Sequence, residues 1–153
     1  MARFEPTRRR FLSSALAAAA LAVLAPRAAF AATKLGFAEL YGKISVLGLA
    51  FSDKTKALAG QPVEMQGFMA PPLKAEAQFF VLTEIPMSLC PFCSSDADWP
   101  ANIVVVYLSE KQTFEQANRV IEVKGRLEVG SWTDPETGFV SLLRIVDARF
   151  QTV

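Results

Sequence analysis

Apolar and polar residues alternate most regularly near the end of the chain. In residues 121–129, every second position is apolar or glycine and the positions between them are charged. A two-residue period with one apolar and one charged face predicts a strand that is buried on one side. The sequence Asp134-Pro135-Glu136-Thr137-Gly138 follows, and its proline and glycine are typical of a turn. We therefore expect a hairpin between this strand and the apolar run of residues 139–150.

Three shorter apolar runs precede this hairpin, at residues 63–68, 79–83 and 103–108. Each has the length of a strand, so at least five strands are expected. Met65 lies within the first run and Met69 directly follows it, so we expect both in the core rather than at a metal.

One short helix is expected to begin at Thr113. The Thr113 hydroxyl can cap the first free amides while Gln116 reaches back, which is a capping box. Five strands with one short helix before the final hairpin predict a mainly β fold, a small five-stranded OB-like barrel. A two-sheet sandwich is the alternative.

The first residues have the three parts of an export signal: a basic start, an apolar run over residues 11–24 and small residues at Ala29-Phe30-Ala31. The segment Thr7-Arg8-Arg9-Arg10-Phe11-Leu12-Ser13 resembles the twin-arginine consensus through Arg8, Arg9, Phe11 and Leu12. We expect cleavage after Ala31 and a periplasmic location. An uncut membrane anchor is the alternative, but the apolar run is shorter than the ~20 residues that span a bilayer.

Three segments are therefore expected: a signal peptide at 1–31, a lead-in at 32–58 and an OB-like barrel at 59–153. The lead-in is expected to hold a short helix and irregular chain. Phe37, Leu40 and Tyr41 have helical spacing, but glycines at 36, 42 and 48 interrupt the pattern.

Removal of the signal changes the charge of the protein. Residues 1–31 contain five of the 16 basic residues and one of the 15 acidic ones, so 11 basic and 14 acidic residues remain, a net charge of −3. A chain without excess positive charge is a poor partner for nucleic acid. No second apolar run is long enough to cross a bilayer, so no stable membrane insertion is expected after cleavage.

The only two cysteines of the chain, Cys90 and Cys93, lie in a loop with two residues between them. Such a pair can chelate a soft metal ion, form a small disulfide or cycle between the two redox states. For a metal, Asp96 and Asp98 would add oxygen ligands, and Met87 a thioether if the ion were Cu(I). We expect zinc or copper as the ion.

The ligand count leaves alternatives open. A structural zinc site needs four ligands, and this chain supplies two cysteines and no histidine, so a homodimer that shares four cysteines would complete it. A structural disulfide in an oxidising compartment is an equal alternative. Thiol-disulfide catalysis is less favoured, because the acidic residues Asp96 and Asp98 would raise the pKa of a nearby thiol.

Three segments of the chain together resemble an uncharacterised family of bacterial exported proteins. These segments are residues 60–73, which include Gly67-Phe68, then 79–82 and the cysteine loop, then residues 100–107. The resemblance implies an OB-like fold and a role beside envelope transporters. Many such loops carry a histidine beside the cysteine, and this chain has none. We thus expect a non-catalytic binding or accessory protein with a partner in the envelope, rather than an enzyme.

Overall fold

The computed structural model describes residues 31–42, 49–71, 78–87 and 99–153. Two short helices precede most of the strands: η1 (Phe37–Glu39), a single turn of 3-10 helix, and α1 (Asp53–Ala57). The strands are β1 (Thr33–Lys34), β2 (Pro62–Met69), β3 (Phe79–Thr83), β4 (Ile103–Leu108), β5 (Val120–Thr133) and β6 (Val140–Thr152). Within the described residues, no helix is long and apolar enough to cross a membrane.

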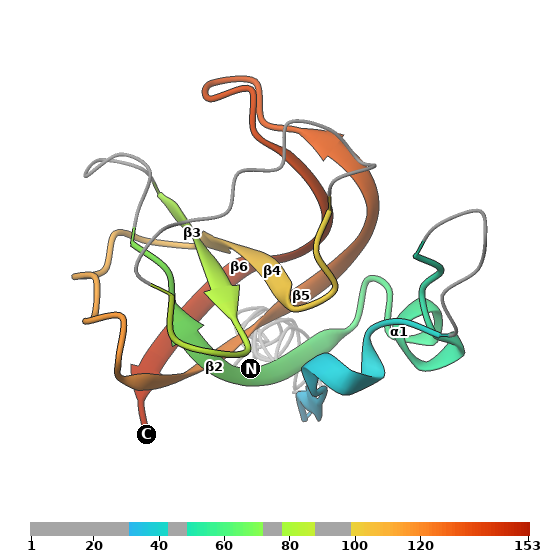
Figure 1. Ribbon diagram of the computed structural model, residues 1–153, viewed down its shortest axis with the longest axis horizontal. Helices are drawn as coiled ribbons and strands as arrows, with labels where there is room; N and C mark the ends of the chain where they lie inside the picture. Colours follow the sequence, from blue (N-terminus) through green and yellow to red (C-terminus); the bar gives the residue numbers. More distant parts are fainter. Residues whose placement is uncertain (1–30, 43–48, 72–77, 88–98) are drawn as a thin grey trace, which may run out of the picture. The chain divides into compact units, whose positions relative to one another are not determined.

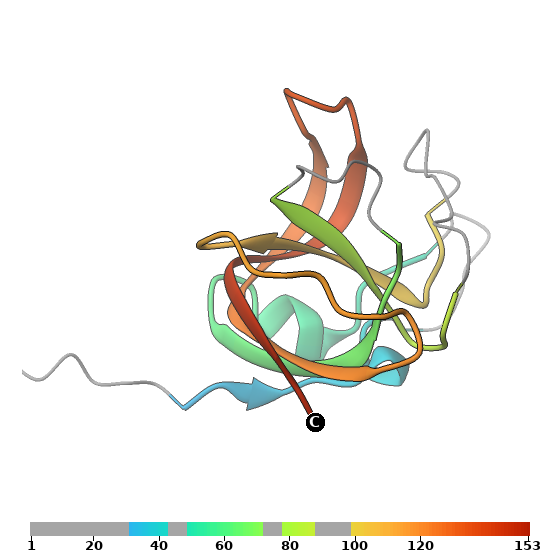
Figure 2. The same cartoon turned by 90° about the vertical axis from the view of Figure 1, so that its left-hand side faces the viewer.

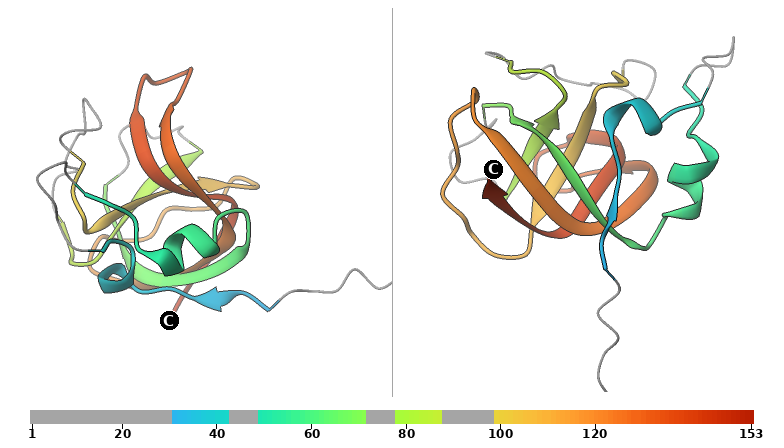
Figure 3. Two further views of the ribbon diagram at one scale, coloured as in Figure 1. Left: turned by 90° about the vertical axis from the view of Figure 1, so that its right-hand side faces the viewer. Right: turned by 90° about the horizontal axis from the view of Figure 1, so that it is seen from below.

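Five strands form a nearly closed ring (Figure 1). The order around the ring is β2-β3-β4-β6-β5, and β5 returns to β2. All of these pairs are antiparallel except β4 with β6, which is parallel. This is the connectivity of an OB-like barrel, so the predicted fold class is confirmed. The short strand β1 pairs in parallel with the beginning of β2, at Val63 and Glu64 (Figure 3).

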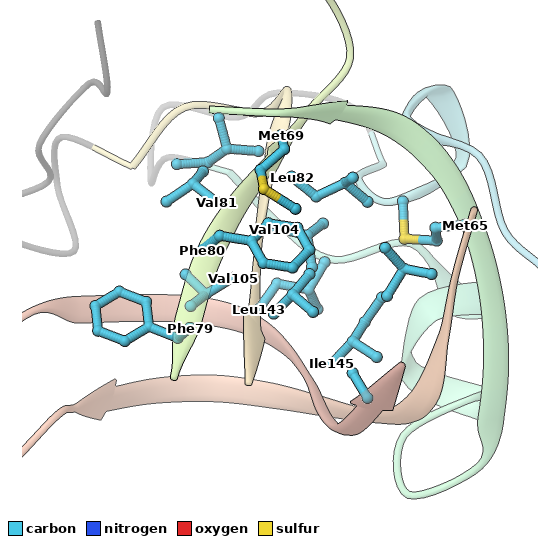
Figure 4. Close-up of a cluster of buried hydrophobic side chains, with 14 of the residues drawn as sticks. Met65, Met69, Phe79, Phe80, Val81, Leu82, Val104, Val105, Leu143 and Ile145 are labelled. Carbon is cyan, nitrogen blue, oxygen red and sulfur yellow. The ribbon is translucent and has the colours of Figure 1, made fainter. Parts of the chain in front are cut away.

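The interior of the ring is filled by apolar side chains. Met65, Phe80, Leu82, Leu143 and Ile145 point toward one another between the strands (Figure 4), and none of them exposes more than 1% of its surface. Successive residues of a strand point to opposite faces, so Phe79 points away from this cluster. Met69 is also 1% exposed, which confirms both methionines as core residues.

Strands β3 and β4 are buried on both faces. Their inner faces carry Phe80 and Val106, which are register partners, and their outer faces carry Val81 and Val105, also partners. All four are at most 2% exposed. Burial on both sides explains why these two sequences are continuous apolar runs, whereas β5 alternates.

The predicted hairpin of β5 and β6 is confirmed. Its turn is built on Asp134, whose Oδ1 accepts hydrogen bonds from the backbone amides of Glu136 (2.9 Å) and Thr137 (2.8 Å). Gly138 has a φ of 72°, a left-handed conformation that favours glycine. Beyond the ring, the hairpin continues as a two-stranded arm of residues 129–133 and 140–143, which rises above the other strands in Figure 2.

The prediction of a helix that begins at Thr113 is wrong. Residues 111–116 are neither helix nor strand. Gln112 instead bonds the backbone of Phe150 in both directions: its Nε2 donates to the carbonyl (3.1 Å) and its Oε1 accepts from the amide (3.1 Å). These bonds hold the segment against β6, and the capping box does not form a helix. The short helix is α1 in the lead-in, where Ser52 caps the amide of Thr55.

Candidate functional site

The cysteine loop connects β3 to β4, and the barrel holds both of its ends. Thr83 pairs with Ile103, and the Glu84 amide donates a hydrogen bond to the Asn102 carbonyl at 3.1 Å. The Thr83 hydroxyl lies 3.2 Å from the Phe68 carbonyl oxygen and 2.7 Å from that of Ile85. The loop therefore leaves and rejoins the barrel at neighbouring points.

Most of the predicted metal ligands lie outside the described residues. Cys90, Cys93, Asp96 and Asp98 belong to residues 88–98, as the signal residues Arg8, Arg9, Phe11 and Leu12 belong to residues 1–30. Met87 is described and lies half-buried shortly after β3. The part of the chain that the structure describes contains no group of three or more His, Cys, Asp or Glu side chains able to hold a metal ion. The metal prediction thus depends on the loop.

The second end of the loop is anchored by Trp99. This side chain is only 4% exposed, and its Nε1 donates a hydrogen bond to the Tyr41 hydroxyl at 2.6 Å. The Tyr41 ring stacks on Phe51 with centroids 5.4 Å apart. Trp99 is therefore a core residue that joins the loop to the lead-in.

A second candidate site was not found from the sequence. Four aromatic side chains, which we call the aromatic clamp, meet where the arm lies against β3 and β4: Phe79, Tyr107, Trp132 and Phe139. Tyr107 stacks on Phe79 (centroids 5.1 Å apart) and meets Trp132 edge to face (5.3 Å), while Phe139 contacts Phe79 (5.7 Å). Aromatic pairs at these distances stabilise a fold beyond the area that they bury.

Arg144 lies under the aromatic clamp with its guanidinium 5.2 Å from the centre of the Trp132 ring. Its Nη1 donates to the carbonyls of Gly130 (2.8 Å) and Ser141 (3.2 Å), and its Nε lies 3.4 Å from Glu128 Oε2. The residue is 7% exposed. A buried charge needs such partners, and here the carboxylate and the ring supply them.

Asp134 joins the turn to the aromatic clamp. Its Oδ2 accepts a hydrogen bond from the Tyr107 hydroxyl at 3.0 Å. Burial opposes the charge of Asp134, but hydrogen bonds from Thr137, Tyr107 and Glu136 outweigh it and hold the pKa of this carboxyl below its usual value. Burial, and then the negative charge of Asp134, raise the pKa of Tyr107. Tyr107 therefore stays a neutral hydrogen-bond donor.

The outer faces of β2 and β5 carry a network of ion pairs. Lys124 Nζ lies 2.9 Å from Glu122 Oε1 and 3.2 Å from Glu64 Oε2. The hydrogen bonds with these carboxylates raise the pKa of Lys124, and the one from Lys124 lowers that of Glu122. In addition, no buried side-chain nitrogen or oxygen of the described residues lacks a hydrogen-bond partner. These charged groups are thus engaged in the fold.

Comparison with known proteins gives a likeness of fold. The structure is similar to a DUF3299 family protein from Pseudomonas aeruginosa PAO1, with a TM-score of 0.52 and 14% sequence identity over 80% of this chain and 97% of that chain. No protein-family model matches the sequence, and no curated protein matches it either. At this level of sequence identity, the likeness supports the architecture alone.

Proposed function

We propose that this protein is an exported, non-catalytic binding module that holds a soft metal ion, zinc or Cu(I), through Cys90 and Cys93. The observation that carries the proposal is that both ends of the loop with the only two cysteines are fixed to a barrel whose interior is filled. A rigid frame limits the conformations of a ligand-bearing loop and so lowers the entropic cost of closing it on an ion.

The chemistry of the loop supports a cation rather than a reaction. Two thiolates suit a soft ion, and Asp96 and Asp98 add negative charge. Met87 lies in the same loop, shortly before Cys90, and provides a thioether for Cu(I). In the described residues, the buried carboxylate of Asp134 accepts hydrogen bonds from its own turn and from Tyr107, so it is not free to act as a general base. The partner is then an envelope transporter or metalloprotein that accepts the ion.

The test is a native mass spectrum of the protein recovered from the periplasm without reductant or added metal, repeated under denaturing conditions. A metal adduct that is lost on denaturation, with two free thiols recovered, supports the proposal. The mass also shows whether one ion joins two chains, as a homodimer with a four-cysteine site requires. Cys90→Ser with Cys93→Ser should abolish the adduct, and Met87→Leu should weaken only a Cu(I) adduct.

Other results would overturn the metal proposal. A bare chain lighter by two hydrogens means a loop disulfide, and the protein is then a structural interaction module. Turnover in a thiol-exchange assay together with a depressed thiol pKa means a redox enzyme. An adduct that persists in the double serine variant places the ion elsewhere.

A further inference from the structure

The arm carries a tryptophan that the fold holds in place but does not bury. Trp132 is 38% exposed, the largest side chain among the exposed hydrophobic residues of the described chain. Arg144 and Tyr107 contact its ring at 5.2 and 5.3 Å. A ring restrained in this way loses little conformational freedom when a ligand stacks on it.

One nitrogen of Arg144, Nη2, makes no hydrogen bond to the described residues, and its guanidinium lies beside this ring. Its hydrogen bonds to described residues come from Nε and Nη1. The residue is 7% exposed. Nη2 carries two N–H groups that can donate to the oxygen of a ligand beside Trp132.

The charges around Trp132 do not favour an anion. Arg144 pairs with Glu128, and Glu128 also accepts from Arg126 at 2.8 Å. Arg126 in turn pairs with Asp147 at 3.2 Å. With the ionised Asp134, these described residues have three carboxylates and two guanidinium groups, which is unlike a phosphate-binding surface. An uncharged, polar ligand is the better match.

The position of the aromatic clamp on the barrel also points to a ligand. OB-folds bind oligonucleotides and oligosaccharides on the face of their second and third strands and at the loop between their fourth and fifth. In this chain, the corresponding elements are β3, β4 and the turn between β5 and β6. Phe79, Tyr107 and Asp134 come from these three elements, and Trp132 stands beside them.

We propose that the surface formed by Trp132, Tyr107, Arg144 and Glu128, which we call the saccharide surface, binds an uncharged oligosaccharide. The apolar face of a sugar ring packs on the exposed part of Trp132. Its hydroxyl groups accept a hydrogen bond from Arg144 Nη2 and donate one to Glu128, whose side chain is 35% exposed. This binding is separate from the metal proposal, because none of these residues belongs to the cysteine loop.

The test is a titration of the isotope-labelled protein, followed by NMR, with three uncharged probes: cellotetraose, maltotetraose and chitotetraose. At least one should give saturable shifts of the Trp132 indole resonance below about 10 mM, a weak affinity on the scale of protein–ligand complexes. The indole of Trp99 should not shift, because it is buried and bonded to Tyr41. Trp132→Ala should weaken binding at least about tenfold, and Trp132→Phe should retain part of it.

Val120→Ala is the matched control, because Val120 lies on the same strand and is also 38% exposed, at the other end of β5. It should leave the affinity unchanged, as should Cys90→Ser with Cys93→Ser. The proposal is overturned if none of the three probes gives saturable shifts, or if Trp132→Ala binds as well as the parent protein. Shifts produced by an oligothymidylate and not by the sugars would replace it with a nucleic-acid site.

Discussion

Trp99 and Tyr41, which are 58 residues apart in the sequence, share a hydrogen bond of 2.6 Å between the indole nitrogen and the phenol oxygen. One residue ends the cysteine loop, and the other belongs to the lead-in. Tyr41 also stacks on Phe51, and Leu40 beside it is fully buried. The lead-in is therefore part of the barrel's core, and it supports the end of the candidate loop.

Tyr41→Phe should destabilise the protein by about 1–3 kcal/mol, because the buried indole N–H of Trp99 loses its acceptor. The measurement is urea-induced unfolding followed by circular dichroism. Trp99→Phe and the double variant complete a cycle in which the double variant should cost less than the sum of the single ones. Additive costs would mean that the hydrogen bond contributes nothing to stability.

Gly125→Ala should lower the free energy of unfolding by at least about 1–3 kcal/mol. A Cβ there would lie 2.6 Å from Ile145 Cγ2 and 2.7 Å from the Val146 carbonyl oxygen. β5 and β6 approach too closely at this bend to admit a methyl group. Gly36→Ala is the control, because its nearest neighbour would be Glu39 Oε2 at 3.6 Å. Its effect should stay within about 0.5 kcal/mol. Equal losses of unfolding free energy would contradict the close approach.

Asp134→Asn tests the carboxylate of the hairpin turn. The folded-state pKa of Asp134 lies below its ordinary value of 3.8. Its charged form therefore stabilises the fold above that pH, and the contribution disappears as the pH falls through the lower folded-state pKa. At pH 7 the variant should lose about 1–3 kcal/mol, since an amide nitrogen cannot accept the Tyr107 hydrogen bond. The difference from the parent should shrink in acid.

Urea unfolding of both proteins from neutral pH to below pH 3.8 measures this difference. Glu39 and Glu122 also have lowered pKa values, but both are present in the two proteins and cancel in the comparison. A constant difference at every pH would show that the charge of Asp134 is not what stabilises the turn.

Ser52→Ala should cost about 1 kcal/mol, a usual figure for the loss of an N-cap. Ser52 Oγ accepts from the Thr55 amide at 3.0 Å and donates to the Glu39 carbonyl at 2.6 Å, so it joins α1 to η1. Lys56→Ala on the same helix removes an exposed ion pair with Asp53 and should cost less than about 0.5 kcal/mol. The measurement is the free energy of unfolding of both variants in urea. A larger loss of stability for Lys56→Ala than for Ser52→Ala would refute the capping role.

The local sequence pattern predicted strands and turns correctly where no tertiary contact opposed it. The apolar runs at 79–83 and 103–108 coincide with β3 and β4, and the turn at Asp134 joins β5 and β6. The capping box at Thr113 was misleading, because Gln112 finds partners in the backbone of Phe150, 38 residues away. A capping interaction stabilises a helix only slightly, so contacts with a distant strand override it.

The sequence by itself determined the five strands of the ring, the hairpin and the barrel class, because these follow from periodicity and turn residues that act over a few positions. It also named Cys90 and Cys93 as the candidate ligands, since residue type alone defines that chemistry. Only the tertiary structure decided that Arg144 lies against Trp132 and that Asp134 meets Tyr107. These pairs come from different strands and turns, and closure of the ring brings them together, which no local pattern encodes.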